Sequence, residues 1–218
     1  MGKNGYVDAM QMPSSTNAAG SAAGNTRDAD SFSLGHVFAA LVVFSFRLWY
    51  AVAKRWRKGM TRAEQMVKRL ETHLKDKVML EVACGCGEFS LAAAGLAREI
   101  HCLDLDADRL LPGLKNCPNV VFDQMDAAAM TYPANCFDIV VLYNALAHVE
   151  LVLDPLLEGC LRVLKPEGCM LLLSSFKMDK AVMTEKLLPL LQKKHIAYRQ
   201  YEKGAFTCIE TDKMLYGG

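Results

Sequence analysis

The sequence predicts an α/β fold: a doubly wound sheet of about seven strands, mostly parallel, with an antiparallel last strand. The first observation is an alternation of short apolar runs with stretches of helical spacing. The apolar runs are residues 77–82, 99–103, 120–122, 137–143 and 170–174, and the helical stretches lie near residues 88–97, 106–115, 154–164 and 180–194. Such alternation is typical of a parallel sheet covered by helices on both faces. The second observation is a hairpin pattern, residues 197–202 and 206–211 around Lys203-Gly204, which would close the sheet with an antiparallel pair.

The chain of 218 residues is long enough for one such domain and a tail. Residues 1–31 are rich in Ser, Ala, Gly and Asn, which predicts a disordered tail. Residues 32–60 predict an apolar N-terminal helix, either packed as a lid on the domain or associated with a membrane. His36 and Arg47 interrupt its apolar run, which disfavours a membrane span. Thr61 and Glu64 form a capping-box pattern, so the main domain is predicted at residues 61–218.

Charge and cysteine content exclude several classes of protein. The chain has 25 Lys and Arg against 24 Asp and Glu, so the basic face typical of nucleic-acid binding is not expected. The eight cysteines are scattered and several lie in apolar runs, which indicates free thiols in a reducing, cytoplasmic location. A membrane-bound helix at residues 32–57 would make that location peripheral. No Cys or His spacing suits zinc, so no metal is predicted.

The stretch after the first strand is the strongest candidate for a ligand-binding loop. Val78-Met79-Leu80 is a buried strand, Glu81 ends it, and residues 83–87 (Ala-Cys-Gly-Cys-Gly) turn into a helix. Ligands of open α/β sheets bind at the carboxyl ends of the strands, where glycine lets the backbone approach them. The second strand ends at Asp104, the position where an acidic residue accepts hydrogen bonds from ribose hydroxyls. Asp106 is expected to cap the helix that follows.

Two departures from the dinucleotide fingerprint indicate which nucleoside is bound. Ser90 stands where a third glycine is expected, and the Glu81 carboxylate would repel a phosphate. A carboxylate there suits a cationic ligand, and S-adenosylmethionine carries a sulfonium and an ammonium group. A nicotinamide-dependent oxidoreductase, the rival enzyme on a similar sheet, is therefore disfavoured.

These residues resemble the class I S-adenosylmethionine-dependent methyltransferases, which have a Rossmann-like fold, and in particular the small-molecule group related to the ubiquinone and menaquinone methyltransferases. The resemblance covers residues 61–175 best. It implies that Glu81 anchors the loop near the methionine end of S-adenosylmethionine, and that the backbone at Ala83, Gly85 and Gly87 cradles the cofactor. It also places Gly168 in a turn before the fifth strand, where we expect a positive φ.

The later motifs imply the remaining cofactor contacts. By resemblance, Asp104 binds the ribose and Leu105 lies beside the adenine, while Asp126 and the Ala127 amide contact the adenine amino group. At the end of the fourth strand, Tyr143 and Asn144 would face the methyl-transfer site.

Methyl transfer from a sulfonium is an in-line displacement, so a general base is needed only when the acceptor must lose a proton. His148 follows the fourth strand and is the candidate base; the alternative, favoured by the resemblance, is that it starts the next helix and hydrogen-bonds the scaffold.

The aromatic residues within 32–57 favour a lid over an apolar, quinone- or lipid-like acceptor, although simple packing on the sheet explains them equally well. A non-catalytic cofactor-binding protein is the other alternative, and the oligomeric state is not predicted.

Overall fold

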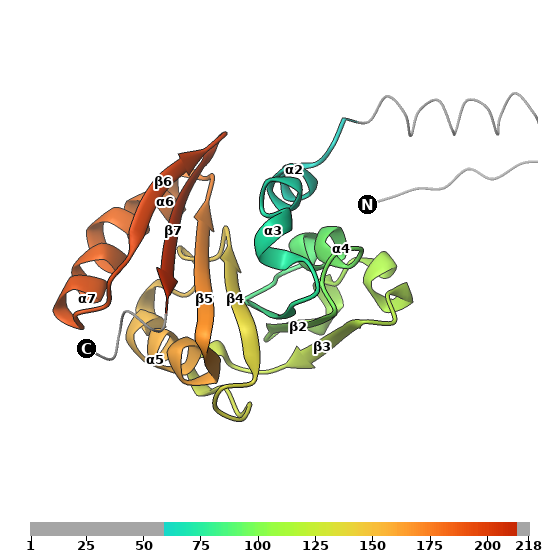
Figure 1. Cartoon of the computed structure of the whole chain (residues 1–218), viewed down its shortest axis with the longest axis horizontal. Helices are drawn as coiled ribbons and strands as arrows, with labels where there is room; N and C mark the ends of the chain where they lie inside the picture. Colours follow the sequence, from blue (N-terminus) through green and yellow to red (C-terminus); the bar gives the residue numbers. More distant parts are fainter. Residues whose placement is uncertain (1–58, 213–218) are drawn as a thin grey trace, which may run out of the picture. The chain divides into compact units, whose positions relative to one another are not determined.

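The computed structural model describes residues 59–212, which form one seven-stranded sheet flanked by helices (Figure 1). The strands are β1 (Val78–Val82), β2 (Glu99–Asp104), β3 (Val120–Gln124), β4 (Phe137–Tyr143), β5 (Leu164–Ser174), β6 (Arg199–Lys203) and β7 (Phe206–Asp212). Their order in the sheet is β3-β2-β1-β4-β5-β7-β6. Strands β1 to β5 pair in parallel, and β7 runs antiparallel to both of its neighbours. The predicted fold class is confirmed. The predicted tail and most of the predicted N-terminal helix lie outside the described residues.

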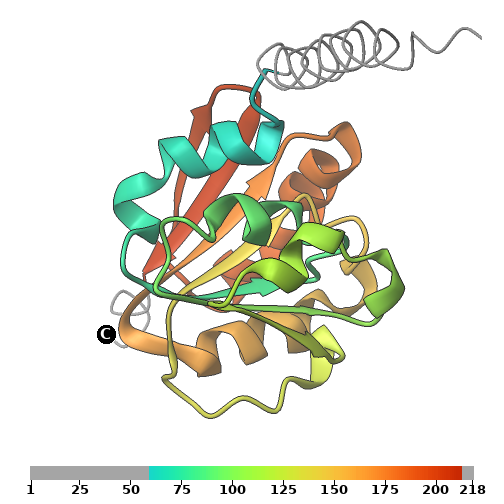
Figure 2. The same ribbon diagram turned by 90° about the vertical axis from the view of Figure 1, so that its right-hand side faces the viewer.

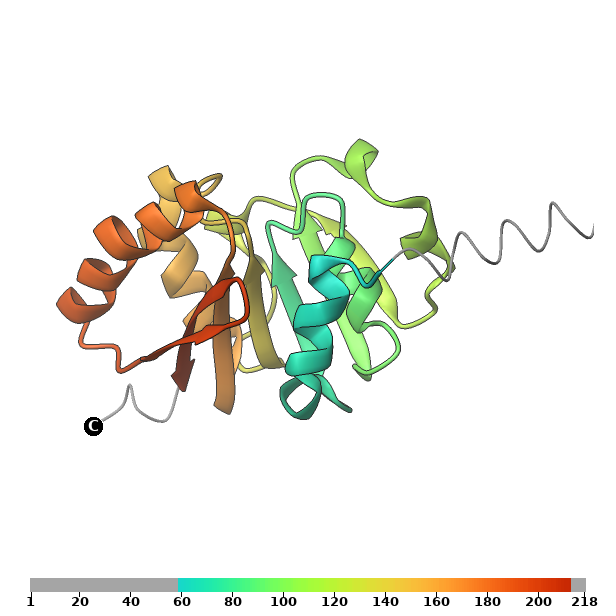
Figure 3. The same ribbon diagram turned by 90° about the horizontal axis from the view of Figure 1, so that it is seen from above.

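Helices cover both faces of the sheet (Figures 2 and 3). They are α2 (Arg62–Arg69), α3 (Glu71–Leu74), α4 (Glu88–Ala93), α5 (Leu153–Val163), α6 (Lys177–Val182) and α7 (Leu188–Lys193). Helices α2, α3 and α4 bury their apolar side chains on one face, and α5, α6 and α7 bury theirs on the other. The predicted capping box opens α2: the Glu64 amide donates to Thr61 Oγ1 and the Thr61 amide donates to the Glu64 carboxylate. No helix between residues 59 and 212 is both long and apolar enough to cross a membrane.

The two helical layers explain why the central strands carry runs of consecutive apolar residues. Side chains alternate between the faces of a sheet, so consecutive residues of a strand enter different cores. In β4, Ile139 and Val141 pack with α2 to α4, whereas Val140 and Leu142 pack with α5 to α7. All four are buried. A strand covered on both faces therefore needs apolar residues at most positions. The exception in β4 is Asp138, which lies near the amino end of the strand and pairs with Lys165.

Three predicted helices differ from the structure. The helix expected near residues 106–115 is wrong: two short 3-10 helices, Ala107–Arg109 and Pro112–Asn116, stand there. Pro112 forces Leu111 into an extended conformation, which prevents a continuous helix. Helix α4 ends at Ala93, shortly before Gly95. The last helical stretch begins earlier than predicted and widens into a π-helical turn, Met183–Leu187, ahead of Pro189, which has no amide to donate.

The turn before the fifth strand also differs from expectation. Strand β5 begins at Leu164 instead of Met170, with an irregular register against β4. Gly168 is not in the left-handed region, so the expected positive φ is wrong. A Cβ atom there would lie 2.9 Å from the Asp138 carbonyl oxygen and 2.8 Å from Leu164 Cδ1. Glycine is needed at this position because the chain passes close to β4, and not because of its own φ.

Candidate active site

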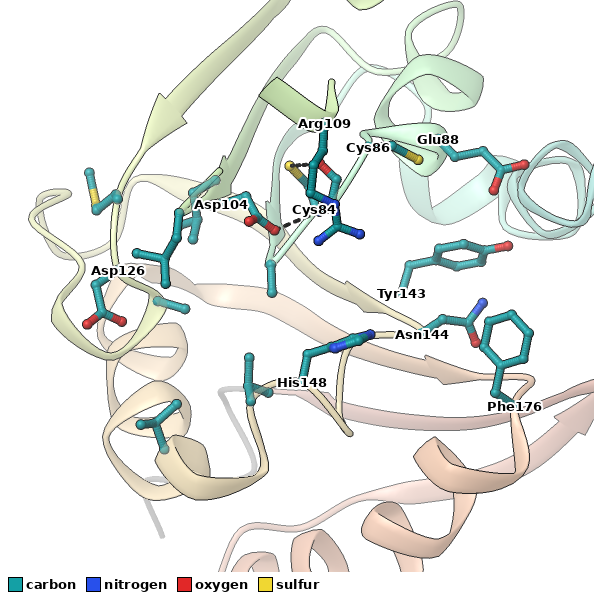
Figure 4. A pocket seen from close by; sticks show the side chains of 18 of the residues that line it. Cys84, Cys86, Glu88, Asp104, Arg109, Asp126, Tyr143, Asn144, His148 and Phe176 are labelled. Atoms are coloured by element: carbon teal, nitrogen blue, oxygen red, sulfur yellow. Dashed lines mark hydrogen bonds between the residues drawn. The ribbon is translucent and has the colours of Figure 1, made fainter. Parts of the chain in front are cut away.

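A cavity of about 710 Å³ opens at the carboxyl ends of the parallel strands (Figure 4). Nine of the eleven residues predicted for the site line it: Ala83, Gly85, Asp104, Leu105, Asp126, Ala127, Tyr143, Asn144 and His148. Glu81 and Gly87 do not line it. Segments that follow β1, β2, β3 and β4 therefore meet at one edge of the sheet, as its topology requires.

The loop of residues 83–87, called here the glycine loop, is built from left-handed turns. Ala83, Gly85 and Gly87 have φ values of 54°, 57° and 73°. Glycine adopts this region freely, whereas an alanine there costs about 1–2 kcal/mol, so the strain at Ala83 is held by its surroundings. Two hydrogen bonds fix the loop to the end of β2: the Cys84 amide donates to the Leu103 carbonyl at 2.9 Å, and the Gly85 amide donates to Asp104 Oδ2 at 2.7 Å.

Glu81 lies beneath the glycine loop and is 1% exposed. Its carboxylate accepts hydrogen bonds from the Ser90 amide at 2.9 Å and from Ser90 Oγ at 2.5 Å. Burial raises the pKa of Glu81 to about 7, although the Ser90 bonds oppose this. The pair ties the end of β1 to the first turn of α4, and this explains why serine stands where a dinucleotide fingerprint has glycine. Direct contact of Glu81 with a cofactor remains a prediction.

Gly87 is the last residue of the glycine loop and does not line the cavity. A Cβ atom on it would be 2.9 Å from Leu114 Cδ2, and its φ is positive. Glycine is therefore required by packing and by backbone conformation together. Its contact with a cofactor also stays a prediction.

Asp104 is positioned to hold a hydroxyl-bearing ligand. Besides the bond from Gly85, its Oδ1 accepts from the Asp106 amide at 3.2 Å. Each carboxylate oxygen can accept a second hydrogen bond, so the cavity side of Asp104 remains available to ribose hydroxyls. Asp106 accepts from the Asp108 amide at 2.9 Å, which confirms its capping role, though on a 3-10 helix.

The next part of the cavity combines an apolar and an acidic side chain. Leu105 is 66% exposed, although it is large and apolar. Asp126 accepts from the Ala128 amide at 2.8 Å and caps a 3-10 helix whose first residue, Ala127, is buried. An exposed apolar side chain and a carboxylate are the two groups that the predicted adenine contact requires, and that contact stays a prediction.

The carboxyl end of β4 presents two polar side chains. The Tyr143 ring packs against Phe89 and Phe206, with centroids 5.1 and 5.6 Å apart. Burial raises the pKa of the Tyr143 hydroxyl, so it stays a proton donor. Asn144 has a φ of 50°, and its Oδ1 accepts from the Ser175 amide at 2.7 Å and from Ser175 Oγ at 3.0 Å. The Asn144 amide nitrogen is consequently the group left for a ligand (Figure 4).

His148 is exposed and its imidazole points into the cavity (Figure 4). It belongs to a turn after β4, ahead of the 3-10 helix Glu150–Val152, and it does not start α5. Buried Asp179 of α6 accepts from the Ala147 amide at 2.8 Å and so holds this turn. Between residues 59 and 212, no side chain or backbone group hydrogen-bonds the His148 ring, so the ring is available to a ligand.

The sequence did not reveal the outer part of the cavity, called here the rim and made of Arg62, Leu151 and Phe176. The guanidinium carbon of Arg62 lies 5.6 Å from the centre of the Phe176 ring, a cation–π contact. Leu151 is 95% exposed and Phe176 is 52% exposed. These three residues come from three distant segments, and only the folded chain brings them together. Glu88 and Arg109 also line the cavity and were not predicted.

Cys84 of the glycine loop is not equipped for nucleophilic chemistry. A hydrogen bond with Cys102, together with burial, raises the pKa of the Cys84 thiol, so Cys84 remains protonated. The part of the chain that the structure describes contains no group of three or more His, Cys, Asp or Glu side chains that could hold a metal ion.

Comparison with known proteins agrees with this site. Residues 79–168 match the family model described as "Methyltransferase domain". A SAM-dependent methyltransferase from Aquifex aeolicus is similar in structure, with a TM-score of 0.56 and 16% identity over 68% of this chain and 87% of that one. A TehB-like SAM-dependent methyltransferase from Corynebacterium glutamicum has a TM-score of 0.58 and 16% identity over 75% of this chain and 97% of that one. A search of curated proteins finds no match.

The matched segment contains the glycine loop, Asp104, Asp126 and the end of β4, which are the parts that line the cavity. The similar structures share the fold of this chain, with TM-scores above 0.5. Residues 79–168 therefore match a methyltransferase domain, and the described sheet has the fold of S-adenosylmethionine-dependent methyltransferases.

Proposed function

We propose that the chain is a class I S-adenosylmethionine-dependent methyltransferase whose methyl acceptor is an apolar small molecule of quinone- or lipid-like character. The observation that carries this proposal is the pair of large apolar side chains, Leu151 and Phe176, that line the cavity while exposed to solvent. Exposed apolar side chains at a cavity mark a surface that gains free energy when a ligand covers it. The predicted lid at residues 32–57 would add aromatic surface, but it lies outside the described residues. Relationship to the ubiquinone and menaquinone methyltransferases is part of this proposal.

The positions of these residues along the cavity support the following division of roles, which is part of the proposal. Asp104 holds the ribose, while Leu105, Asp126 and Ala127 surround the adenine. The glycine loop, Glu81 included beneath it, supports the methionine end, and Tyr143 and Asn144 lie where donor and acceptor meet. S-adenosylmethionine supplies a methyl group already activated by the sulfonium charge. The protein therefore mainly aligns the acceptor and excludes water.

A general base is required only if the acceptor atom carries a proton, as in a phenol or hydroquinone. Tyr143 is unsuited because burial raises its pKa and keeps it protonated. His148 has a free imidazole that reaches the cavity, so it takes this role in our proposal. A pH profile of turnover that loses its acidic limb in His148→Gln would support this role, and an unchanged profile would contradict it.

The acceptor class can be tested with matched rim variants. The full chain is incubated with S-adenosylmethionine and a panel of quinols, lipid amines and polar amines, and S-adenosylhomocysteine formation is measured. Leu151→Ser and Phe176→Ser should each lower turnover of an apolar acceptor about tenfold, since each removes about 1–2 kcal/mol of apolar contact, and should leave S-adenosylhomocysteine affinity unchanged. Met178→Ser is the control, because Met178 is 73% exposed and does not line the cavity.

Two other results would redirect the proposal. Preference for polar acceptors, or rim variants no weaker than Met178→Ser, would contradict an apolar acceptor. Binding of S-adenosylhomocysteine without turnover of any acceptor would favour a non-catalytic cofactor-binding protein. Removing residues 32–57 tests the lid: if these residues form one, turnover of an apolar acceptor should fall. Co-sedimentation of the full chain and of the shortened chain with anionic vesicles tests the peripheral membrane location.

A further inference from the structure

We propose that Arg109 recognises the carboxylate of the cofactor's methionine moiety and thereby selects the intact amino-acid end of S-adenosylmethionine. The inference rests on the cofactor assignment made above. It concerns a residue that no motif pointed to: Arg109 ends the 3-10 helix Ala107–Arg109, in the segment where the sequence predicted an ordinary helix.

The segment that contains Arg109 contacts three consecutive residues of the glycine loop, Gly85, Cys86 and Gly87. Arg109 Nη2 lies 3.8 Å from the place that a Cβ atom on Gly85 would occupy. The Leu111 amide donates to the Cys86 carbonyl at 3.0 Å. Leu114 packs on Gly87. The backbone that carries Arg109 is therefore fixed against the loop, and its guanidinium points into the cavity (Figure 4).

Among the described residues, the charges around the cavity leave Arg109 without a counter-ion. Across residues 59–212, no carboxylate lies within ion-pair distance of its guanidinium. Asp104 and Asp126, two acids that line the cavity, accept hydrogen bonds from backbone amides. The other guanidinium of the cavity, that of Arg62, is stacked over Phe176 at the rim. Arg109 is thus the cation best placed to receive an anion over the glycine loop.

The ligand offers one anion, and the site orients it toward Arg109. A nucleoside held at Asp104 with its base between Leu105 and Asp126 must direct its 5′ substituent the other way, over the glycine loop. In S-adenosylmethionine that substituent bears one carboxylate. A guanidinium binds a carboxylate through two parallel N–H···O bonds, which is a geometric match that an ammonium or sulfonium group lacks.

The test compares two ligands that differ only in the carboxylate, S-adenosylhomocysteine and its decarboxylated analogue, by calorimetric titration of the full chain. Wild type should bind S-adenosylhomocysteine at least tenfold more tightly than the analogue. Arg109→Ala should lose most of this preference by weakening only the complete ligand, and Arg109→Lys should keep part of it. Lys115→Ala is the matched control, because Lys115 is an exposed cation of the neighbouring 3-10 helix that does not line the cavity.

The outcomes separate this inference from the cofactor assignment. Equal weakening of both ligands by Arg109→Ala, or no weakening of either, would overturn the role of Arg109 while leaving the cofactor intact. Failure of wild type to bind S-adenosylhomocysteine at all would overturn the cofactor assignment itself, and the Arg109 proposal with it.

Discussion

The glycine loop and the rim lie on the same cavity but are built in opposite ways. The loop is held by backbone hydrogen bonds to β2 and by the buried pair of Glu81 and Ser90. The rim consists of side chains from three separate segments, of which Leu151 and Phe176 are exposed. Arg62 and Phe176 form a cation–π pair there. A loop fixed by its backbone suits a cofactor that never changes. A rim of exposed side chains can be altered without disturbing the fold, which suits the part that chooses the acceptor.

The largest expected effect concerns the buried support of the loop. The pKa of Glu81 is about 7 in the folded protein against 4.5 for an ordinary glutamate, so the folded state retains a proton that the unfolded state loses between these values. Stability is therefore lost as pH rises from 4.5 to 7, by about 3 kcal/mol. Chemical denaturation of wild type and Glu81→Gln at pH 4.5 and 8 measures it. Between these two pH values, the unfolding free energy of Glu81→Gln should fall by about 3 kcal/mol less than that of wild type. Equal falls in the two proteins would contradict a proton held on Glu81 by burial.

The second prediction concerns the joint between the loop and β2. Asp104→Ala removes the acceptor of the Gly85 amide and the proposed ribose contact. Hydrogen bonds to a charged group contribute about 1.5–3 kcal/mol, so S-adenosylhomocysteine affinity should fall about 100-fold in calorimetric titration. Asp108→Ala is the control, because Asp108 is an exposed acid of the adjacent 3-10 helix that does not line the cavity. An unchanged affinity for Asp104→Ala would show that the ribose site is placed wrongly.

The third prediction separates strain from hydrogen bonding at the end of β4. Asn144→Ala leaves the Ser175 amide and hydroxyl without their acceptor and keeps a side chain at a φ of 50°. We expect a loss of unfolding free energy of about 2–3 kcal/mol. Asn144→Gly also loses the acceptor but is relaxed at this φ, so it should be about 1 kcal/mol more stable than the alanine variant. Equal stability of the two variants in denaturant titration would mean that the backbone here is not strained.

The smallest effect is expected at His148. Its ring hydrogen-bonds none of the described residues, so His148→Ala should leave thermal stability unchanged and S-adenosylhomocysteine affinity within about threefold, less than one hydrogen bond. Differential scanning fluorimetry and calorimetric titration measure the two quantities. A tenfold loss of affinity would mean that the imidazole contacts the cofactor. His148 would then belong to the cofactor site and not to the adaptable acceptor side of the cavity.

The same contrast explains what the sequence could predict. The strands, the glycine loop and Asp104 have local signatures, because an apolar strand must end in a polar turn and that turn needs particular residues. The segment after β2 has helical spacing, but Pro112 divides it into two 3-10 helices. The position of Arg109 over the glycine loop depends on this division of the segment, so the sequence pattern does not predict it. Arg62, Leu151 and Phe176 carry no local signature, since only the sheet topology brings them to one cavity.

The central claim is that the cavity binds S-adenosylmethionine through the glycine loop and Asp104. Calorimetric titration of the full chain with S-adenosylhomocysteine, and separately with NAD, tests it most directly. We predict saturable binding of one S-adenosylhomocysteine per chain and no detectable binding of NAD. Binding of NAD without binding of S-adenosylhomocysteine would contradict the account.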